Sequence, residues 1–245
     1  MASERRVAIV TGGGSGIGAA CAKAIAARNF AVVVADLDAH GGADVVASIV
    51  ADGGTATFLA SDVSDPGANE ALVTEALDSF GRLDAAVNNA GILGDMLPLG
   101  EYSDEQWREV MRVNLDGVFY GIRAQLPPML ERGRGSIVNM ASVAGQVAYP
   151  GAPAYVASKH AVVGLTRQLA AEYAARGIRA TAVGPGAVQT PMIDRPETQG
   201  VEQAHPIGRV GQPVEIAEVV AWLCADAPDF LNGAYIPVDG GYLTR

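Results

Sequence analysis

The most informative stretch of this 245-residue chain reads Thr11-Gly12-Gly13-Gly14-Ser15-Gly16-Ile17-Gly18. It follows a short apolar run at residues 7–10, typical of a β-strand, and opens directly into a helical pattern over residues 17–28. Glycines let a backbone turn sharply and approach a pyrophosphate, and the start of a helix offers free N–H groups to phosphate oxygens. Because both the strand and the helix flank it, the stretch predicts a dinucleotide-binding loop. The loop residues expected to contact the dinucleotide are Gly12, Ser15, Gly16, Ile17 and Gly18.

Short β-branched runs alternate with longer helical patterns along the rest of the chain. The expected strands cover residues 31–35, 57–60, 84–87, 136–140, 178–183 and 234–238, and the expected helices include residues 39–51, 119–130 and 154–176. Strands that are apolar throughout are typical of a parallel sheet covered by helices on both faces. The sequence therefore predicts an α/β fold, a doubly wound parallel sheet of the Rossmann type, in one domain over residues 1–245.

Composition and charge narrow the classes of function. Hydrophobic residues make up 49% of the chain and charged residues 18%, which suits a globular domain. The formal net charge of −10 provides no positive field for nucleic acid or an anionic membrane. With no apolar leader and no apolar run of about 18 residues, we expect a cytoplasmic protein that acts on a small molecule. We expect Cys21 and Cys224 to be reduced and buried, and we expect no metal site.

The second expected strand ends at Asp36, 18 residues after Gly18. A carboxylate at this point accepts hydrogen bonds from both ribose hydroxyls and repels a 2′-phosphate. Neither Ser15 nor its neighbour Leu37 supplies a basic side chain for such a phosphate. A turn former at a strand end is the alternative for Asp36. Its register with the glycine loop favours NAD over NADP as the cofactor, with Asp36 and Leu37 beside the ribose.

An acid/base pair is expected at the start of the helix over residues 154–176. Tyr155 and Lys159 are four residues apart, so they share one face of that helix. A cation beside a phenol favours the phenolate, which makes the tyrosine a usable proton acceptor near neutral pH. Ser142 ends an earlier strand and is expected to bond the same substrate oxygen.

The sequence resembles the short-chain dehydrogenase/reductase family over essentially its whole length. In chain order, the residues that carry this resemblance are Thr11 to Gly18, Asp62-Val63, Asn88-Asn89-Ala90-Gly91, Asn114, Ser142, Tyr155, Lys159, Pro185-Gly186 and Thr190. One departure is Thr181, where the family often has Asn.

The resemblance implies an NAD-dependent oxidoreductase that acts on a secondary alcohol carbon. It implies that Tyr155 removes the hydroxyl proton, that Ser142 holds the substrate oxygen, and that Asn114 holds a water linking Lys159 to solvent. The resemblance also implies which residues contact each part of the cofactor. The adenine would lie between Asp62 and Val63, and the cleft would be closed by Asn89, Ala90 and Gly91. The nicotinamide would be held by Pro185, Gly186, Val188 and Thr190, and Tyr155 and Lys159 would contact the cofactor as well.

The candidate walls of the substrate pocket are small and mostly apolar. They are Leu93, Gly94, Ala144, Gln146, Tyr149, Ala187, Met192 and His205. No arginine or extra lysine is expected among them, so an uncharged and compact substrate, a cyclic or hydrophobic secondary alcohol or its ketone, is favoured. Residues 187–192 and 205–209 are similar to those of NAD-linked dehydrogenases of cyclic alcohols and dihydrodiols. His205 has the alternative of capping a turn, and Gln146 and Tyr149 have the alternative of plain packing.

Two rival functions remain at this stage. A 3-oxoacyl carrier-protein reductase of this family usually uses NADPH with basic residues near the phosphate, and Asp36 argues against that. A non-catalytic, cofactor-bound sensor would have no need for Asn114, Ser142, Tyr155 and Lys159 together.

Two further expectations concern a loop and the assembly. Residues 190–212 contain Pro191, Pro196 and Pro206 without clean periodicity, which predicts a substrate lid loop, with a plain surface excursion as the alternative.

The expected helices at 119–130 and 154–176 carry more apolar positions than one stripe requires, and the C-terminus is apolar as well. We therefore expect a homotetramer, with a dimer as the alternative.

Overall fold

A seven-stranded, all-parallel sheet forms the centre of the computed structural model, which describes residues 5–194 and 200–244. The strand order is β3-β2-β1-β4-β5-β6-β7. The strands are β1 (Arg6–Thr11), β2 (Phe30–Asp36), β3 (Thr55–Ala60), β4 (Ala85–Asn88), β5 (Gly135–Met140), β6 (Ile178–Pro185) and β7 (Ala234–Val238). This is the predicted doubly wound α/β fold in one domain.

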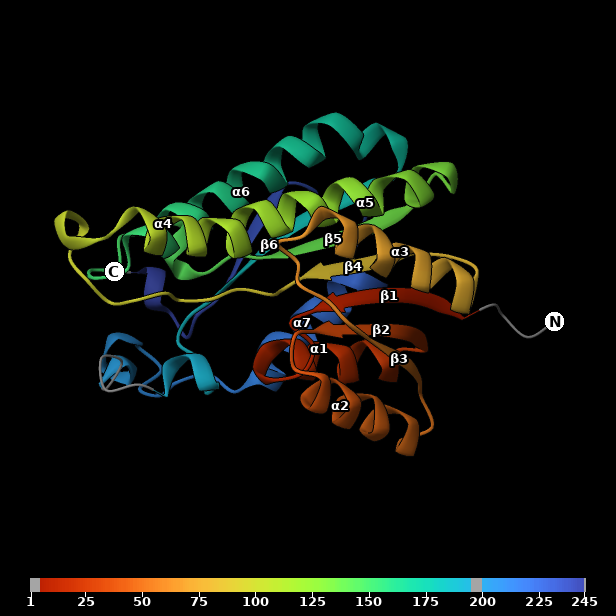
Figure 1. Cartoon of the computed structure of the whole chain (residues 1–245), viewed down its shortest axis with the longest axis horizontal. Helices are drawn as coiled ribbons and strands as arrows, with labels where there is room; N and C mark the ends of the chain where they lie inside the picture. Colours follow the sequence, from red (N-terminus) through yellow and green to blue (C-terminus); the bar gives the residue numbers. More distant parts are fainter. Residues whose placement is uncertain (1–4, 195–199, 245) are drawn as a thin grey trace.

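Helices cover both faces of the sheet (Figure 1). One layer holds α1 (Gly16–Ala27), α2 (Ala39–Ala51) and α7 (Pro213–Ala225). The other holds α3 (Pro66–Phe80), α4 (Asp104–Met111), α5 (Gly117–Glu131) and α6 (Pro153–Tyr173). Because alternate side chains of a strand point to opposite faces, β1 and β2 contribute valines to both hydrophobic clusters.

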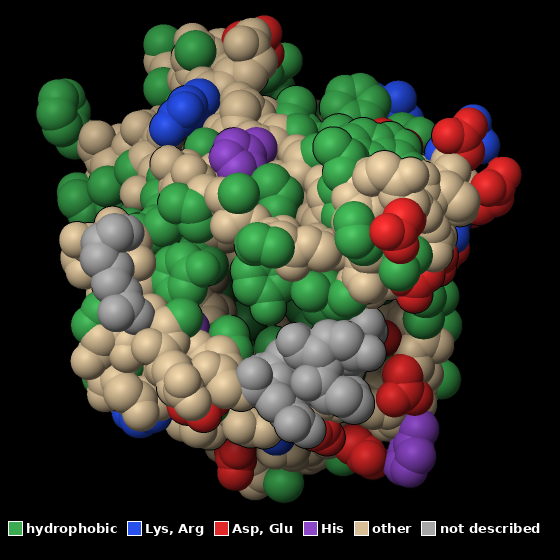
Figure 2. All heavy atoms as spheres, turned by 90° about the vertical axis from the view of Figure 1, so that its left-hand side faces the viewer, with side chains coloured by type: hydrophobic (Ala, Val, Ile, Leu, Met, Phe, Trp, Pro, Cys, Tyr) green, Lys and Arg blue, Asp and Glu red, His purple; other side chains and the backbone are tan. Residues whose placement is uncertain are grey.

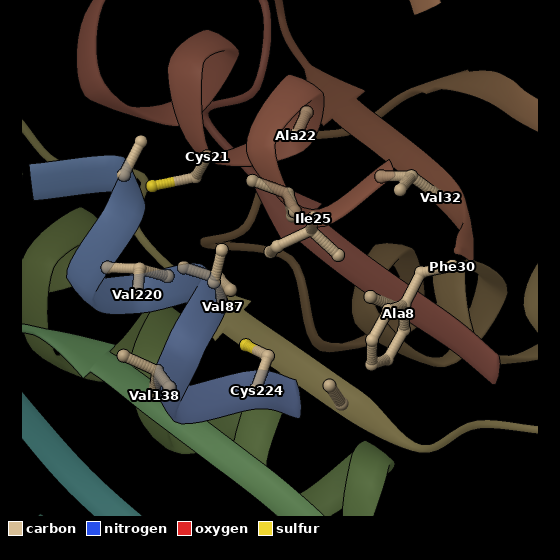
Figure 3. Close-up of a cluster of buried hydrophobic side chains, with 14 of the residues drawn as sticks. Ala8, Cys21, Ala22, Ile25, Phe30, Val32, Val87, Val138, Val220 and Cys224 are labelled. Atoms are coloured by element: carbon tan, nitrogen blue, oxygen red, sulfur yellow. The ribbon is translucent and has the colours of Figure 1, made fainter. Parts of the chain in front are cut away.

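The cluster under α1 and α7 contains both cysteines. Figure 3 shows Cys21 and Cys224 among Ile25, Val87 and Val220, and both thiols are free and buried. This confirms the expectation of reduced, buried cysteines. Burial raises the pKa of the Cys224 thiol to about 12, so it is an unreactive packing group.

The direction of strand order reverses between β1 and β4, and the chain is tied together at that point. Asn89 donates from its side-chain amide to the carbonyl oxygens of Thr11 at 2.9 Å and Gly12 at 3.2 Å. The Thr11 hydroxyl in turn accepts the N–H groups of Asn89 and Ala90. Ligands of open parallel sheets bind at such a switch point, beyond the carboxyl ends of the strands.

Strand and helix positions agree with the sequence prediction to within one or two residues at most ends. Residues 39–51 are α2 as expected, whereas β3 begins at Thr55 and β6 runs on to Pro185. The sequence pattern did not delimit α3, α4 or α7. A five-residue π-helical turn, Arg112–Asp116, also went unpredicted; it joins α4 to α5.

Some of the apolar residues of α6 that suggested a partner chain are covered within this chain, whereas Leu165 and Tyr173 are only partly buried. Val162, Val163, Leu169 and Ala170 are buried in its own core, against β5, β6 and α5. The C-terminal segment likewise turns inward, since Tyr242 lines a cavity. These residues therefore do not require a second subunit to cover them. No helix in the described part of the chain is long and apolar enough to span a membrane.

The turn between α6 and β6 offers a test of backbone packing. Gly177 has φ +81°, and a Cβ there would lie 1.9 Å from the carbonyl oxygen of Gly133. Gly53 has the same φ, +81°, with open space around it. We expect Gly53→Ala to lower the free energy of unfolding by about 1 kcal/mol, the cost of a left-handed alanine. We expect Gly177→Ala to lower it by roughly 3 kcal/mol or more, because the backbone must also move.

Urea denaturation of the two variants and the wild type measures this difference. Equal losses in both variants would show that the approach of Gly177 to Gly133 is not a constraint on the fold.

Candidate active site

A groove and a cavity adjoin each other at the carboxyl ends of the strands, with volumes of about 450 Å³ and about 140 Å³. Figure 2 shows this end of the molecule hollowed, with hydrophobic side chains gathered around the hollow. The groove is lined by the predicted cofactor residues Gly12, Ser15, Gly16, Ile17, Gly18, Asp36, Leu37, Asp62, Val63, Asn89, Ala90 and Gly91. The cavity is lined by the predicted residues Ser142, Tyr155, Lys159, Pro185, Gly186, Val188 and Thr190.

The glycine loop has the close approach that a phosphate-binding loop needs. A Cβ on Gly18 would lie 1.9 Å from the Gly12 carbonyl oxygen, so only glycine fits where α1 passes the loop. Helix α1 begins at Gly16, and its first N–H groups have no partner inside the helix. The residues present therefore fit a pyrophosphate at this position.

Asp36 is held at the end of β2 by backbone donors. Its carboxylate accepts the N–H of Gly14 at 2.8 Å and that of Asp38 at 3.0 Å. In the described residues the groove contains the carboxylates of Asp36 and Asp62 and no lysine or arginine. These carboxylate acceptors suit ribose hydroxyls at Asp36 and disfavour an additional phosphate there.

The side chain of Asn114 holds the loop after β4 through hydrogen bonds. It lies in the π-helical turn, donates to the Ile92 carbonyl at 2.8 Å, accepts the Ile92 N–H at 2.8 Å and donates to the Ser158 hydroxyl at 3.2 Å. A Cβ on Gly91 would lie 3.2 Å from Asn114 Oδ1 and 3.5 Å from Lys159 Nζ. The loop therefore carries a glycine where the amide and the ammonium both come close.

Tyr155 and Lys159 lie on the first turns of α6, as their spacing predicted. Lys159 Nζ is 5.5 Å from the centre of the Tyr155 ring and donates to the Met140 carbonyl at 2.8 Å. Burial lowers the pKa of Lys159 to about 8. Burial also raises the pKa of Tyr155, while a hydrogen bond with Ser142 lowers it. The spacing in the sequence indicated the pair, and the fold adds the burial that shifts the pKa of both groups.

Ser142 is held from two sides. Its hydroxyl accepts the Ala144 N–H at 3.1 Å, which starts a short turn after β5. Its carbonyl accepts the hydroxyl of Tyr235, on β7, at 3.0 Å. Burial raises the pKa of Tyr235, so this phenol remains a donor. Tyr235 was not indicated by the sequence, because it is 93 residues from Ser142.

His205 is bonded at both ring nitrogens. Nδ1 lies 2.9 Å from the carbonyl of Val201, and Nε2 accepts the N–H of Ala187 at 3.0 Å. The ring is therefore a neutral imidazole with its proton on Nδ1. This geometry fits the alternative prediction for His205, a residue that caps a turn. The ring also borders the cavity.

The cavity wall differs in part from the expected one. Leu93, Ala144, Tyr149, Ala187, Met192 and His205 line it. The structure does not bring Gln146 and Gly94 there. Gln146 is exposed beyond the Ser142 turn, and a Cβ on Gly94 would point at Val110 and Tyr102. Residues that the sequence did not indicate complete the wall, and they include Met140, Val143, Ile193, Val201 and Tyr242.

The expected lid region borders both hollows. Thr190, Pro191 and Met192 line the groove, and Ile193 and Val201 line the cavity. Its described residues form the short 3₁₀ turns Pro191–Ile193 and Val201–Ala204. Residues 195–199 of the predicted lid lie outside the described part of the chain. No cluster of His, Cys, Asp and Glu able to hold a metal ion occurs among the described residues.

Comparisons with known proteins agree with this geometry. A family model described as enoyl-(acyl carrier protein) reductase matches residues 12–243. The chain is 44% identical over 242 residues to a cyclohexanol dehydrogenase of Acinetobacter sp. (strain SE19), covering 99% of this chain and 96% of that protein. It is 46% identical over 241 residues to a 2,5-dichloro-2,5-cyclohexadiene-1,4-diol dehydrogenase of Sphingobium indicum, covering 96% and 95%.

Two further matches bear on the rival function and on the cofactor. A 3-oxoacyl-[acyl-carrier-protein] reductase of Synechocystis sp. is 40% identical over 238 residues, covering 96% of each protein. A solved structure of a putative 2-deoxy-d-gluconate 3-dehydrogenase from Agrobacterium tumefaciens with bound NADP has a TM-score of 0.89 and 36% identity, covering 98% of this chain and 97% of that one. With its fold, its glycine loop and these matches over nearly the full length, the chain belongs to the short-chain dehydrogenase/reductase family and is an oxidoreductase that acts on alcohol groups.

Proposed function

We propose that this protein is a cytoplasmic, NAD-dependent dehydrogenase of uncharged, cyclic or hydrophobic secondary alcohols, working reversibly with the ketone. The observation that carries the proposal is the position of the Ser142, Tyr155 and Lys159 group in the apolar cavity, directly beside the groove with Asp36. A substrate carbon held at Tyr155 would then face the cofactor bound in the groove.

In the proposed reaction, Ser142 and Tyr155 hold the substrate oxygen and Tyr155 takes its proton. When bound, the cofactor accepts the hydride from the carbinol carbon. Tyr235 keeps the turn of Ser142 in position through its bond to the Ser142 carbonyl. Asn114 keeps the loop at Gly91 against Lys159 through its two bonds to Ile92.

Lys159 supports the phenolate through its charge. Its ammonium lies 5.5 Å from the centre of the Tyr155 ring, in a buried setting where charge interactions are screened less than in water. Among the described residues Lys159 donates to one acceptor, the Met140 carbonyl, so two of its three N–H groups are available for other oxygens. We propose that one of them bonds the cofactor ribose.

The choice of NAD over NADP rests on Asp36. Its carboxylate is fixed by two backbone donors and would repel a 2′-phosphate at the ribose. Leu37, next to it, is 73% exposed and cannot neutralise such a phosphate. The solved structure of the Agrobacterium relative contains NADP, so we propose that the two proteins differ in cofactor preference.

The substrate class rests on the chemistry of the cavity wall. Lys159, whose ammonium we propose to support the Tyr155 phenolate and to bond the ribose, is the one lysine or arginine among the described residues of that wall. A carboxylate or phosphate on the substrate would therefore lack a counter-ion. Two relatives named for cyclic alcohols or diols support the same class.

The 3-oxoacyl carrier-protein reductase remains the second candidate function because of the Synechocystis relative, and the measured cofactor preference separates the two functions.

For the assembly we propose a homotetramer, with a dimer as the alternative. Its support is the set of large apolar side chains that the chain leaves exposed on different helices and loops. Phe119 on α5 is 44% exposed, Trp222 on α7 is 38% exposed, and Phe230 is fully exposed. Separate apolar faces suit two isologous interfaces.

Tyr155→Phe is expected to lower turnover of a cyclic secondary alcohol by about 10³-fold, because the proton acceptor is lost. Its affinity for NAD should stay within about threefold of wild type, since the ring and Lys159 remain. Steady-state kinetics with a panel of cyclic alcohols, together with calorimetric NAD titration, measures both. Normal turnover by this variant would overturn the assignment of Tyr155.

NAD should bind at least about tenfold more tightly than NADP, a difference of about 1.4 kcal/mol. The double change Asp36→Ala with Leu37→Arg should move the preference toward NADP, because it exchanges a repelling carboxylate for a cation. Calorimetric titration of both cofactors into both proteins measures the preference. Equal affinities in the wild type would contradict the role of Asp36.

Light scattering after size exclusion at micromolar concentration should give about 100 kDa, four times the chain mass of 25.1 kDa. A species of one chain mass would show that the exposed apolar faces have another purpose.

A further inference from the structure

Most polar side chains of the cavity are already engaged. Asn89 is bonded to Thr11 and Gly12, Lys159 to Met140, and His205 to Val201 and Ala187. Ser142 and Tyr155 bond each other and form the catalytic pair of the proposed function. The wall contains two more phenols that the proposed reaction does not use, those of Tyr149 and Tyr242.

Tyr149 and Tyr242 lie close to each other and come from distant parts of the chain. Burial and the neighbouring Tyr242 raise the pKa of Tyr149, so its phenol is a neutral hydrogen-bond donor at physiological pH. Tyr149 in turn raises the pKa of Tyr155, so Tyr149 lies within electrostatic range of that phenol, and Tyr242 lines the same cavity. Among the described residues, neither hydroxyl has a hydrogen-bond partner.

The backbone around Tyr149 is held in place by the loop after β4. Its carbonyl accepts the N–H of Ala152, and the next turn is tied by the Leu97 N–H, which donates to the Gly151 carbonyl at 2.8 Å. The terminal carbon of Met96 would lie 3.1 Å from a Cβ on Gly151, so the two segments are in contact. The loop after β4 therefore helps to hold the turn that carries Tyr149.

Tyr242 is held by the turn after β7. The carboxylate of Asp239 accepts the N–H groups of Gly241 at 2.9 Å and Leu243 at 3.0 Å, on either side of Tyr242. The Tyr242 ring packs on the buried ring of His205, with centroids 5.1 Å apart. Since His205 is bonded at both nitrogens, it supports the Tyr242 ring by packing.

We propose that Tyr149 and Tyr242 form a second oxygen-binding subsite, so that the preferred substrates carry a second hydroxyl or carbonyl on the ring. Cyclic diols and hydroxyketones are the chemical class that fits it. A neutral phenol is a donor and an acceptor, so it bonds either kind of oxygen, and a substrate oxygen there fills the hydrogen-bonding capacity that the protein leaves open. This inference rests on the proposed function for its reacting centre and adds where the rest of the substrate binds.

The kinetic test compares cyclohexanol with the positional isomers of cyclohexanediol. We expect the wild type to favour at least one diol by about tenfold in kcat/KM, and we expect Tyr149→Phe and Tyr242→Phe each to lower that ratio roughly fivefold, the loss of one neutral hydrogen bond. Tyr173→Phe, at the end of α6 and outside the cavity wall, is the matched control and should keep the wild-type ratio. Thermal denaturation checks that each variant is folded.

A binding measurement separates this inference from the proposed function. In the Tyr155→Phe background with saturating NAD, calorimetry should show the favoured diol binding about tenfold more tightly than cyclohexanol. Adding Tyr149→Phe and Tyr242→Phe should remove that difference. Turnover of cyclohexanol without any diol preference, or a preference that survives both changes, would overturn the subsite and leave the proposed dehydrogenase standing. A preference in binding without turnover of any cyclic alcohol would support the subsite and contradict the proposed reaction.

Discussion

The pairing of β1 with β4 is the constraint on which the rest of the structure depends. These strands meet where the strand order reverses, so the loops after them leave in opposite directions and open a groove between them. Asn89 and Thr11 close this junction with hydrogen bonds between the two loops, which sets the glycine loop at a fixed distance from Gly91. Without that junction the groove that holds Asp36 and the cavity that holds Tyr155 would have no common border.

A second feature is that several parts of the chain hold each polar side chain of the candidate site in position. Ser142, after β5, is held by Tyr235 of β7, and the Lys159 ammonium on α6 is held by the carbonyl of Met140. Behind them, Asn88 and Asn139 bond each other across β4 and β5, and Gln125 and Thr166 complete the bonds from α5 and α6. Buried polar groups whose bonds are satisfied rigidify a core. The polar groups around the cavity that keep free hydrogen-bonding capacity therefore have a defined position from which to bind a ligand.

Local patterns predicted the parts of the site whose spacing is short. The turn of the glycine loop and the Tyr155–Lys159 pair depend on contacts within a few residues, and the structure brings both to the border of the groove and cavity. The cavity wall was predicted less well, because its residues meet through sheet order. Gln146 follows Ser142 closely in sequence but is exposed, while Tyr242, which is distant in sequence, lines the cavity. Periodicity likewise counts the apolar positions of α6 without showing which neighbour covers them: Val162 and Leu169 are buried in the core of this chain, whereas Leu165 is only partly buried.

The sequence by itself determined the parallel α/β architecture, the glycine loop between β1 and α1, the shared helix face of Tyr155 and Lys159 and the carboxylate at the end of β2, because each of these depends on residue type and on periodicity over one strand or helix. Only the tertiary structure decided that Tyr235 supports Ser142, that both nitrogens of His205 are bonded, and that Tyr149 faces the same cavity as Tyr242. These contacts join segments that are neighbours only after the sheet is assembled, and no local pattern specifies which side chains a sheet brings together at its carboxyl edge.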